Sequence, residues 1–142
     1  MFKHLLFLLL LMVVIFSVGD AHTPRELVKF TTVRNFVLEP YSTTVLPAGQ
    51  YIIREVDMET PYLLVLETKD REFLAILNVI PLYQTSKKAM KQSRAEFVWD
   101  FETSFYPVMK KIYLPNGEGF EILRVGYNEK SGKFVHTSHH RL

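Results

Sequence analysis

Histidines near the two ends of the chain are the residues best suited to metal chemistry. His136, His139 and His140 lie in the last seven residues, and His22 becomes N-terminal if a leader is cleaved after Ala21. An amino-terminal histidine can chelate Cu(II) through its amine and ring nitrogen, and a second histidine would complete a square-planar site. We expect a solvated tail with no metal site and no cofactor, and copper binding at His22 is the alternative.

Three carboxylates, Glu96, Asp100 and Glu102, recur at four- and two-residue spacings that place them on one face of a strand, with roughly 7 Å between Asp100 and Glu102. Paired carboxylates at such separations act as acid and base in glycosidases. The alternative explanation is a solvent-exposed strand face, which commonly carries the same residue types. The sequence has no G-x-S-x-G, no H-E-x-x-H and no phosphate-binding glycine loop. We therefore predict a protein that is not an enzyme.

Aromatic residues alternate with these carboxylates. Phe97, Trp99 and Phe101 share the opposite face of the same stretch, and Phe105 and Tyr106 follow it closely. In a barrel such residues could line a pocket for an apolar ligand, although filling the core is their commoner use. The candidate ligand-binding residues are Phe97, Trp99, Phe101 and Tyr106.

A basic segment precedes this stretch. Lys87, Lys88, Lys91 and Arg94 would line one side of a short helix, because their spacings of three and four residues repeat on one helical face. They are candidates for binding anionic lipid head groups, a polysaccharide or a partner protein. The same charges could simply keep a loop soluble and blunt a sheet edge.

The first 21 residues have the pattern of a signal peptide. Lys3 precedes about fifteen apolar residues (5–19), and small residues, including Ala21, end the run. The run is shorter than the roughly 20 residues of a spanning helix. We expect export to the periplasm or the extracellular space, with an uncleaved anchor as the alternative. Residues 22–142 would then form one β domain with a flexible C-terminal tail.

The composition excludes several classes of protein. The chain has 142 residues, 48% of them hydrophobic, a formal net charge of +2 and no cysteine. This hydrophobic share fits one globular core and excludes a disordered chain. The charge gives no reason to expect nucleic-acid binding. The absence of cysteine excludes disulfides, thiolate zinc sites and thiol nucleophiles, and in an exported chain it favours a bacterial envelope protein.

Short strands dominate the rest of the sequence, apart from a marginal two-turn helix expected over Thr23–Phe30 from its hydroxyl cap, proline and glutamate. Period-two alternation and short apolar runs, separated by turns, favour an all-β fold, either an antiparallel β-sandwich or a small closed barrel. A last edge strand is expected near 133–137. The eight main strands are expected near 31–38, 41–46, 50–56, 62–68, 71–80, 95–102, 105–114 and 119–126.

Three turns are expected to make hairpins. Lys69-Asp70-Arg71 separates two apolar runs that we place in the centre of the sheet. Residues 46–49 (LPAG) and 114–117 (LPNG) each place proline at the second turn position and glycine at the last, which presets the turn dihedrals.

Phe36-Val37-Leu38, the LPAGQY stretch 46–51 and the aromatic stretch 97–106 together resemble a group of small exported bacterial proteins with an LPAG-x-Y turn. The resemblance implies a β-rich domain after a signal peptide and no assigned activity. Asp100-Phe101-Glu102 departs from the basic-aromatic-glycine turn of that group.

Taken together, the sequence predicts an exported, non-catalytic β domain that binds an unidentified protein or envelope polymer. The first alternative is a carrier of a small apolar ligand, held in a pocket lined by the hairpin from Phe97 to Tyr106. The second alternative is the copper protein based on His22.

Overall fold

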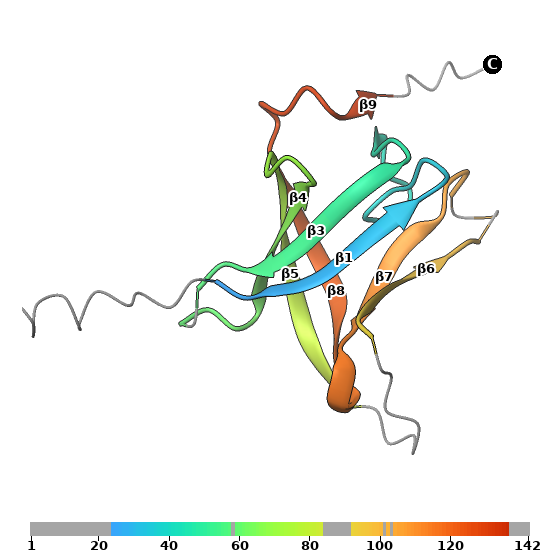
Figure 1. Cartoon of the computed structure of the whole chain (residues 1–142). Helices are drawn as coiled ribbons and strands as arrows, with labels where there is room; N and C mark the ends of the chain where they lie inside the picture. The colour runs from blue at the N-terminus through green and yellow to red at the C-terminus, as the bar shows by residue number, and fades with distance from the viewer. Residues whose placement is uncertain (1–23, 58, 84–91, 101, 103, 137–142) are drawn as a thin grey trace, which may run out of the picture.

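Seven antiparallel strands form one curled sheet (Figure 1). The computed structural model describes residues 24–57, 59–83, 92–100, 102 and 104–136. The strands are β1 (Glu26–Thr32), β3 (Gly49–Glu55), β4 (Leu63–Thr68), β5 (Phe73–Tyr83), β6 (Arg94–Val98), β7 (Val108–Tyr113) and β8 (Glu118–Tyr127). Hydrogen-bonded neighbours follow the order β1-β3-β4-β5-β8-β7-β6, and β1 approaches β6 without pairing with it. The predicted all-β fold is confirmed, and its form is a nearly closed barrel.

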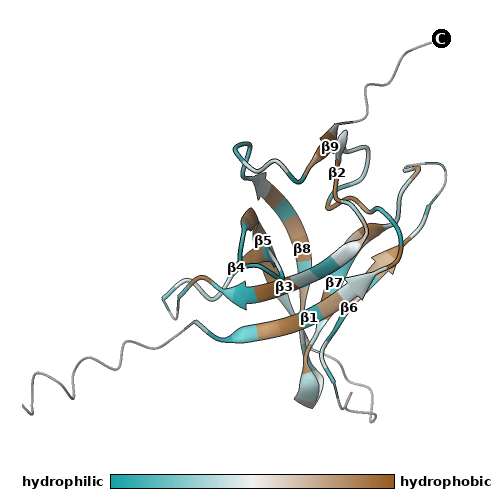
Figure 2. Ribbon diagram, turned by 45° about the horizontal axis from the view of Figure 1, so that its top comes forward, coloured by the Kyte–Doolittle hydropathy of each residue, from teal (hydrophilic) through white to brown (hydrophobic). Residues whose placement is uncertain are grey.

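Alternating side chains fill the interior of this barrel. Ile53 lies opposite Leu66, and Leu64 lies opposite Leu77, and all four side chains are fully buried. Figure 2 shows hydrophobic and hydrophilic segments alternating along the strands, as expected when one face of a sheet is a core. The predicted hairpin at residues 69–71 joins the central strands β4 and β5 and is confirmed.

The expected helix over Thr23–Phe30 is wrong, because most of that segment is strand β1. Val28 and Phe30 lie opposite Ile53 and Tyr51 of β3, so pairing with β3 buries the apolar residues that the short helix would have left exposed. The predicted signal peptide, His22 and the tail beyond His136 lie outside the described residues.

Residues 36–39, which we call the plug, close one end of the barrel. Phe36, Val37 and Leu38 are buried. The Val37 amide donates to the Pro107 carbonyl, and the Met109 amide donates to the Val37 carbonyl, each at 3.0 Å. The plug thus pairs with β7 as a single parallel bridge. The predicted long strand at 31–38 is therefore wrong beyond the end of β1.

A carboxylate attaches the plug to the last strand. Glu39 accepts hydrogen bonds from the Val125 amide and the Tyr127 hydroxyl, each at 3.2 Å. Burial, followed by the influence of the Glu39 carboxylate, raises the pKa of Tyr127 to about 12. The plug therefore bridges β7 and β8 at the end where these two strands no longer pair with each other.

One of the two similar turns makes the expected hairpin. Residues 114–117 join β7 to β8, and Gly117 adopts the positive φ of 77° that glycine tolerates best. The hairpin expected at 46–49 is wrong, because β2 (Thr44–Val45) pairs with β9 (Val135–His136) and not with β3. The last edge strand expected near 133–137 corresponds to β9.

Candidate functional site

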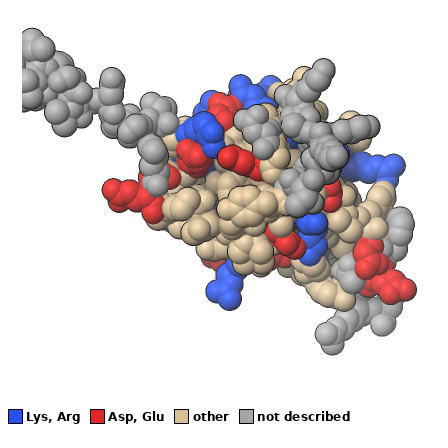
Figure 3. All heavy atoms as spheres, turned by 90° about the horizontal axis from the view of Figure 1, so that it is seen from below, with Lys and Arg blue, Asp and Glu red and all other residues tan. Residues whose placement is uncertain are grey.

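A cleft of about 620 Å³ opens at the end of the barrel opposite the plug. Strands β4 and β8 begin there, and β3 and β5 end there. Leu64, Leu82 and Phe120 supply its apolar lining, and the exposed rings of Tyr62 and Tyr83 stand at its rim. Figure 3, seen from below, shows mostly uncharged side chains across the middle of the molecule, with acidic and basic groups among them and at the margin.

Unequal strand lengths create this cleft. Strand β5 runs on to Tyr83, paired with β8, whereas β4 begins at Leu63, opposite Asn78. Among the described residues, the last part of β5 therefore has no strand beside it on the β4 side, where the Val79 amide donates to the Tyr62 carbonyl. Pro81 lies on this free edge, where a residue without an amide proton costs no ladder hydrogen bond.

The cleft is acidic. Its described lining holds one arginine, Arg25, against three carboxylates, Glu55, Asp57 and Glu118, a formal excess of two negative charges. The Arg25 guanidinium donates to Glu55 at 3.3 Å. Hydrogen bonds from Thr60 hold the pKa of Asp57 below its usual value, and the Thr60 hydroxyl contributes more than the Thr60 amide. This carboxyl therefore stays ionised at neutral pH. Anionic ligands are therefore disfavoured.

The structure separates the predicted aromatic residues. Phe97 packs in the core, with its ring centroid 5.3 Å from that of Phe36 and 5.9 Å from that of Phe30. Trp99 and Tyr106 line a shallow hollow of about 350 Å³ at the plugged end. Phe101 lies outside the described residues. These four residues therefore do not form one ligand pocket among the described residues.

The strand expected at 95–102 ends early, at Val98. Glu96 lies in β6, whereas Asp100 and Glu102 belong to the connection that follows, where the Glu102 amide donates to Asp100 at 3.0 Å. The proposed single face of three carboxylates is therefore wrong, because no strand continues to carry it.

Of the predicted basic surface, the structure describes only Arg94. Its guanidinium lies 5.0 Å from the centre of the Tyr113 ring and 3.5 Å from the Glu96 carboxylate. Lys87, Lys88 and Lys91 lie outside the described residues. The described part of this patch is thus a cation that already has an aromatic and an anionic partner.

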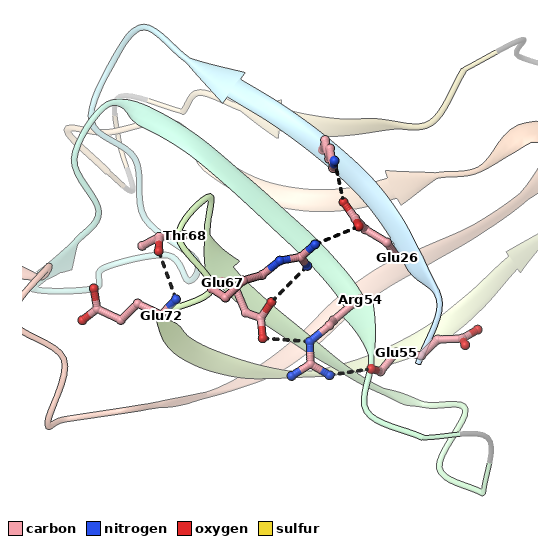
Figure 4. A network of polar contacts seen from close by, with 8 residues as sticks. Glu26, Arg54, Glu55, Glu67, Thr68 and Glu72 are labelled. Atoms are coloured by element: carbon pink, nitrogen blue, oxygen red, sulfur yellow. Dashed lines mark hydrogen bonds and ion pairs between the residues drawn. The ribbon is translucent and has the colours of Figure 1, made fainter. Parts of the chain in front are cut away.

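Glu67, the buried carboxylate among the described residues, belongs to an ion-pair network on the outside of the barrel (Figure 4). The Glu67 side chain is 5% exposed, and its Oε1 accepts from Arg54 Nε at 2.7 Å. Its Oε2 lies 3.6 Å from Arg71 Nη1, and Arg71 also reaches Glu26 of β1 at 3.2 Å. The network therefore links β1, β3 and β4.

Comparisons of the chain with known proteins found no relative. No family model, no curated protein and no solved structure matches the chain. The resemblance to the LPAG-x-Y group stays a prediction. Among the described residues, no helix is long and apolar enough to cross a membrane, and no three histidine, aspartate or glutamate residues gather as metal ligands.

Sequence reasoning missed the cleft. Its lining comes from five separate segments, around residues 25, 55–57, 61–64, 81–83 and 118–120. The one local signal was Pro81 inside an apolar run, because proline marks a free strand edge. The acidic character of the rim depends on which strand ends meet, and that depends on the sheet order.

Proposed function

We propose that this protein is an exported, non-catalytic binding module that holds a small apolar ligand, neutral or positively charged, in the cleft at the open end of its barrel. The observation that carries the proposal is the cleft itself. Its volume of about 620 Å³ lies within the range of small-molecule sites, about 300–1,000 Å³.

The lining supports binding more than chemistry. An apolar body would lie against Leu64, Leu82 and Phe120, and the rings of Tyr62 and Tyr83 would cover its exposed side. Carboxylates are the groups of the described lining that could act as a base, and two of the three are already engaged, Glu55 by Arg25 and Asp57 by Thr60. Carboxylates at the rim would attract a positive group and repel a negative one.

Export is the second part of the proposal and is based on the leader pattern of residues 1–21. It predicts a mature chain that begins near Asp20 or His22, in the periplasm or the medium. Mass-spectrometric sequencing of the mature N-terminus tests it. A chain that keeps residues 1–21 and stays in the cytoplasm would contradict export and leave the proposed binding intact.

A dye titration tests the cleft. N-phenyl-1-naphthylamine, which is neutral and apolar, should bind saturably with enhanced fluorescence, and the anionic dye anilinonaphthalene sulfonate should bind at least tenfold more weakly. Leu82→Lys should weaken binding of the neutral dye at least tenfold, because a charge enters the apolar lining. Leu123→Lys is the matched control, since Leu123 is a leucine of β8 that is 61% exposed and lies outside the cleft.

Circular dichroism and thermal unfolding must first show that both variants fold. Saturable binding that Leu82→Lys abolishes and Leu123→Lys retains supports the proposal. Absence of saturable binding, equal loss in both variants, or a preference for the anionic dye overturns it.

A further inference from the structure

The charges around the cleft differ in whether a cation already lies beside them. The side chain and the amide of Arg25 donate to the Glu55 carboxylate at 3.3 and 3.2 Å, so these two charges offset each other. Asp57 accepts from the hydroxyl and the amide of Thr60, both uncharged, at 2.7 Å each. The Glu118 side chain has no hydrogen-bond or ion-pair partner among the described residues. Asp57 and Glu118 therefore keep negative charges that no described cation offsets.

Glu118 faces the cleft from the first position of β8. It lies two residues before Phe120 and four before Ile122, and side chains at two-residue intervals share one face of a strand. Phe120 packs against the core and Ile122 belongs to it, so this face of β8 is directed inward. The free carboxylate therefore stands at the rim, directly outside the apolar lining.

An aromatic ring stands across from this carboxylate. Tyr83 of β5 is the cross-strand partner of Glu118, and the Cβ atoms of such partners lie about 5 Å apart. Tyr83 is 82% exposed, so its ring is accessible to a ligand. A cation between the two residues would gain from the carboxylate and from the negative face of the ring.

The free edge of β5 adds a hydrogen-bond acceptor. The Val79 amide donates toward the β4 side, and the backbone groups of successive residues in a strand point to alternate sides. The Pro81 carbonyl, two residues on, is therefore directed to the same side, where no described strand lies beside it. Proline has no amide proton, so at this position the edge presents an acceptor without a donor. Such an edge suits a ligand that donates hydrogen bonds.

We propose that the ligand of the cleft is an amphiphilic primary amine, whose ammonium group binds Glu118 beside Tyr83 and whose apolar part lies against Phe120. The inference rests on the proposed binding function and narrows the ligand to one chemical class. An ammonium has three N–H donors and a positive charge, which match the carboxylate, the Pro81 carbonyl and the ring face. A neutral ligand leaves the charge of Glu118 unmatched, and an anion is repelled by it.

Three ligands with the same eight-carbon chain separate charge from apolar contact. Octylamine, 1-octanol and octanoate are cationic, neutral and anionic at neutral pH, and isothermal titration calorimetry measures the binding of each to the full chain. Octylamine should bind at least tenfold more tightly than 1-octanol, and octanoate should bind most weakly. The preference for octylamine should fall between 0.05 and 0.5 M NaCl, because salt screens exposed charges.

Glu118→Gln removes the charge of the proposed partner and keeps the shape of its side chain. It should lower the ratio of octylamine affinity to 1-octanol affinity at least fivefold, and it should fold because Glu118 is exposed. Glu129→Gln is the matched control. It removes the same charge from an exposed residue just beyond the far end of β8 and should leave the ratio unchanged.

The outcomes separate this inference from the function on which it rests. Equal affinities for octylamine and 1-octanol, or a preference for octanoate, overturn the inference and leave apolar binding in the cleft intact. A ratio that changes equally, or not at all, in the two variants also overturns it. Absence of binding by octylamine and 1-octanol alike overturns the proposed function and the inference together.

Discussion

Replacement of Glu67 by glutamine tests whether the network on the outside of the barrel stabilises the fold. The substitution keeps the shape of the side chain and removes its charge. Arg54, whose Nε lies 2.7 Å from Glu67 Oε1, then loses its anionic partner, whereas Arg71 loses Glu67 and keeps its ion pair with Glu26. Breaking a fully buried ion pair costs about 3–5 kcal/mol, and an exposed pair contributes about 0.2–1 kcal/mol.

The structure places Glu67 between these limits. Its side chain is only 5% exposed, but those of Arg54 and Arg71 are 29% and 53% exposed and can turn toward water. The amide of glutamine can still accept one hydrogen bond from Arg54. A lost hydrogen bond to a charged group costs about 1.5–3 kcal/mol, so we expect Glu67→Gln to lower the free energy of unfolding by about 2 kcal/mol.

Urea denaturation followed by circular dichroism measures this loss, since urea does not screen charges as guanidinium chloride does. Glu55→Gln is the matched control on the neighbouring strand, because its partner Arg25 is 63% exposed. It should cost less than about 1 kcal/mol. The double variant Arg54→Met with Glu67→Leu should recover most of the loss, because apolar residues can replace a buried pair.

Equal losses for Glu67→Gln and Glu55→Gln would refute the reasoning. They would show that the burial of Glu67 has no energetic consequence and that the network is an ordinary surface feature. A double variant less stable than Glu67→Gln would show instead that Arg71 and Glu26 depend on the charge of Glu67.

Three further changes probe the plug, a turn and a half-buried tyrosine. Phe36→Ala should lower the free energy of unfolding in urea by about 3–5 kcal/mol, because the side chain is fully buried; a loss below about 1.5 kcal/mol would contradict its place in the core. Gly117→Ala should cost about 1–2 kcal/mol because φ is 77° there, whereas thermal unfolding should barely change for Gly132→Ala, whose Cβ would meet nothing within 4 Å. Burial raises the pKa of Tyr127 to about 12, so the folded state favours the neutral phenol, and its contribution to stability is complete below about pH 10 and lost as the pH rises toward 12. Tyr127→Phe should therefore flatten the fall in unfolding temperature over that interval, and an unchanged slope would contradict the shift.

The strands that the sequence predicted well are those whose signals are local. Near-continuous apolar runs gave β4 and β5, and apolar residues between turns gave β3 and β8, each close to its observed bounds. These runs are long enough for their own composition to decide the structure. The turn at 114–117 was predictable for the same reason, since proline and glycine act on the residues next to them.

Strand β1 was missed because pairing with the distant strand β3 outweighs the local sequence pattern that favours a helix. Thr23-Pro24-Arg25-Glu26 is typical of a helix start, but Val28 and Phe30 are followed by Thr31 and Thr32, and the pairing with β3 buries them. A short helix would have gained only weak local stability. The residues of this segment alone do not show that β3, about twenty residues later, has a free edge with which β1 can pair.

The end of β6 was unpredictable for a similar reason. Alternation of side chains along a strand places Phe97 in the interior, and it would place Trp99 there as well if the strand continued. Phe36 of the plug already packs on Phe97, so the interior next to Phe97 is filled by a residue sixty positions away. The chain leaves the sheet after Val98, and Trp99 becomes a surface residue.

The filled interior also decides where a ligand can bind. A barrel of this size has room inside only for its own side chains, and here Leu66, Leu74, Leu77 and Met109 are fully buried there. Among the described residues, the Phe97 ring packs against Phe30 and Phe36 in this interior. The plug fills one end of the barrel, and the shallow hollow that includes Trp99 lies beside it. At the other end, the short strand β4 leaves the cleft open. The binding that we propose is therefore binding at an end of the barrel, in the cleft that the short strand β4 leaves open.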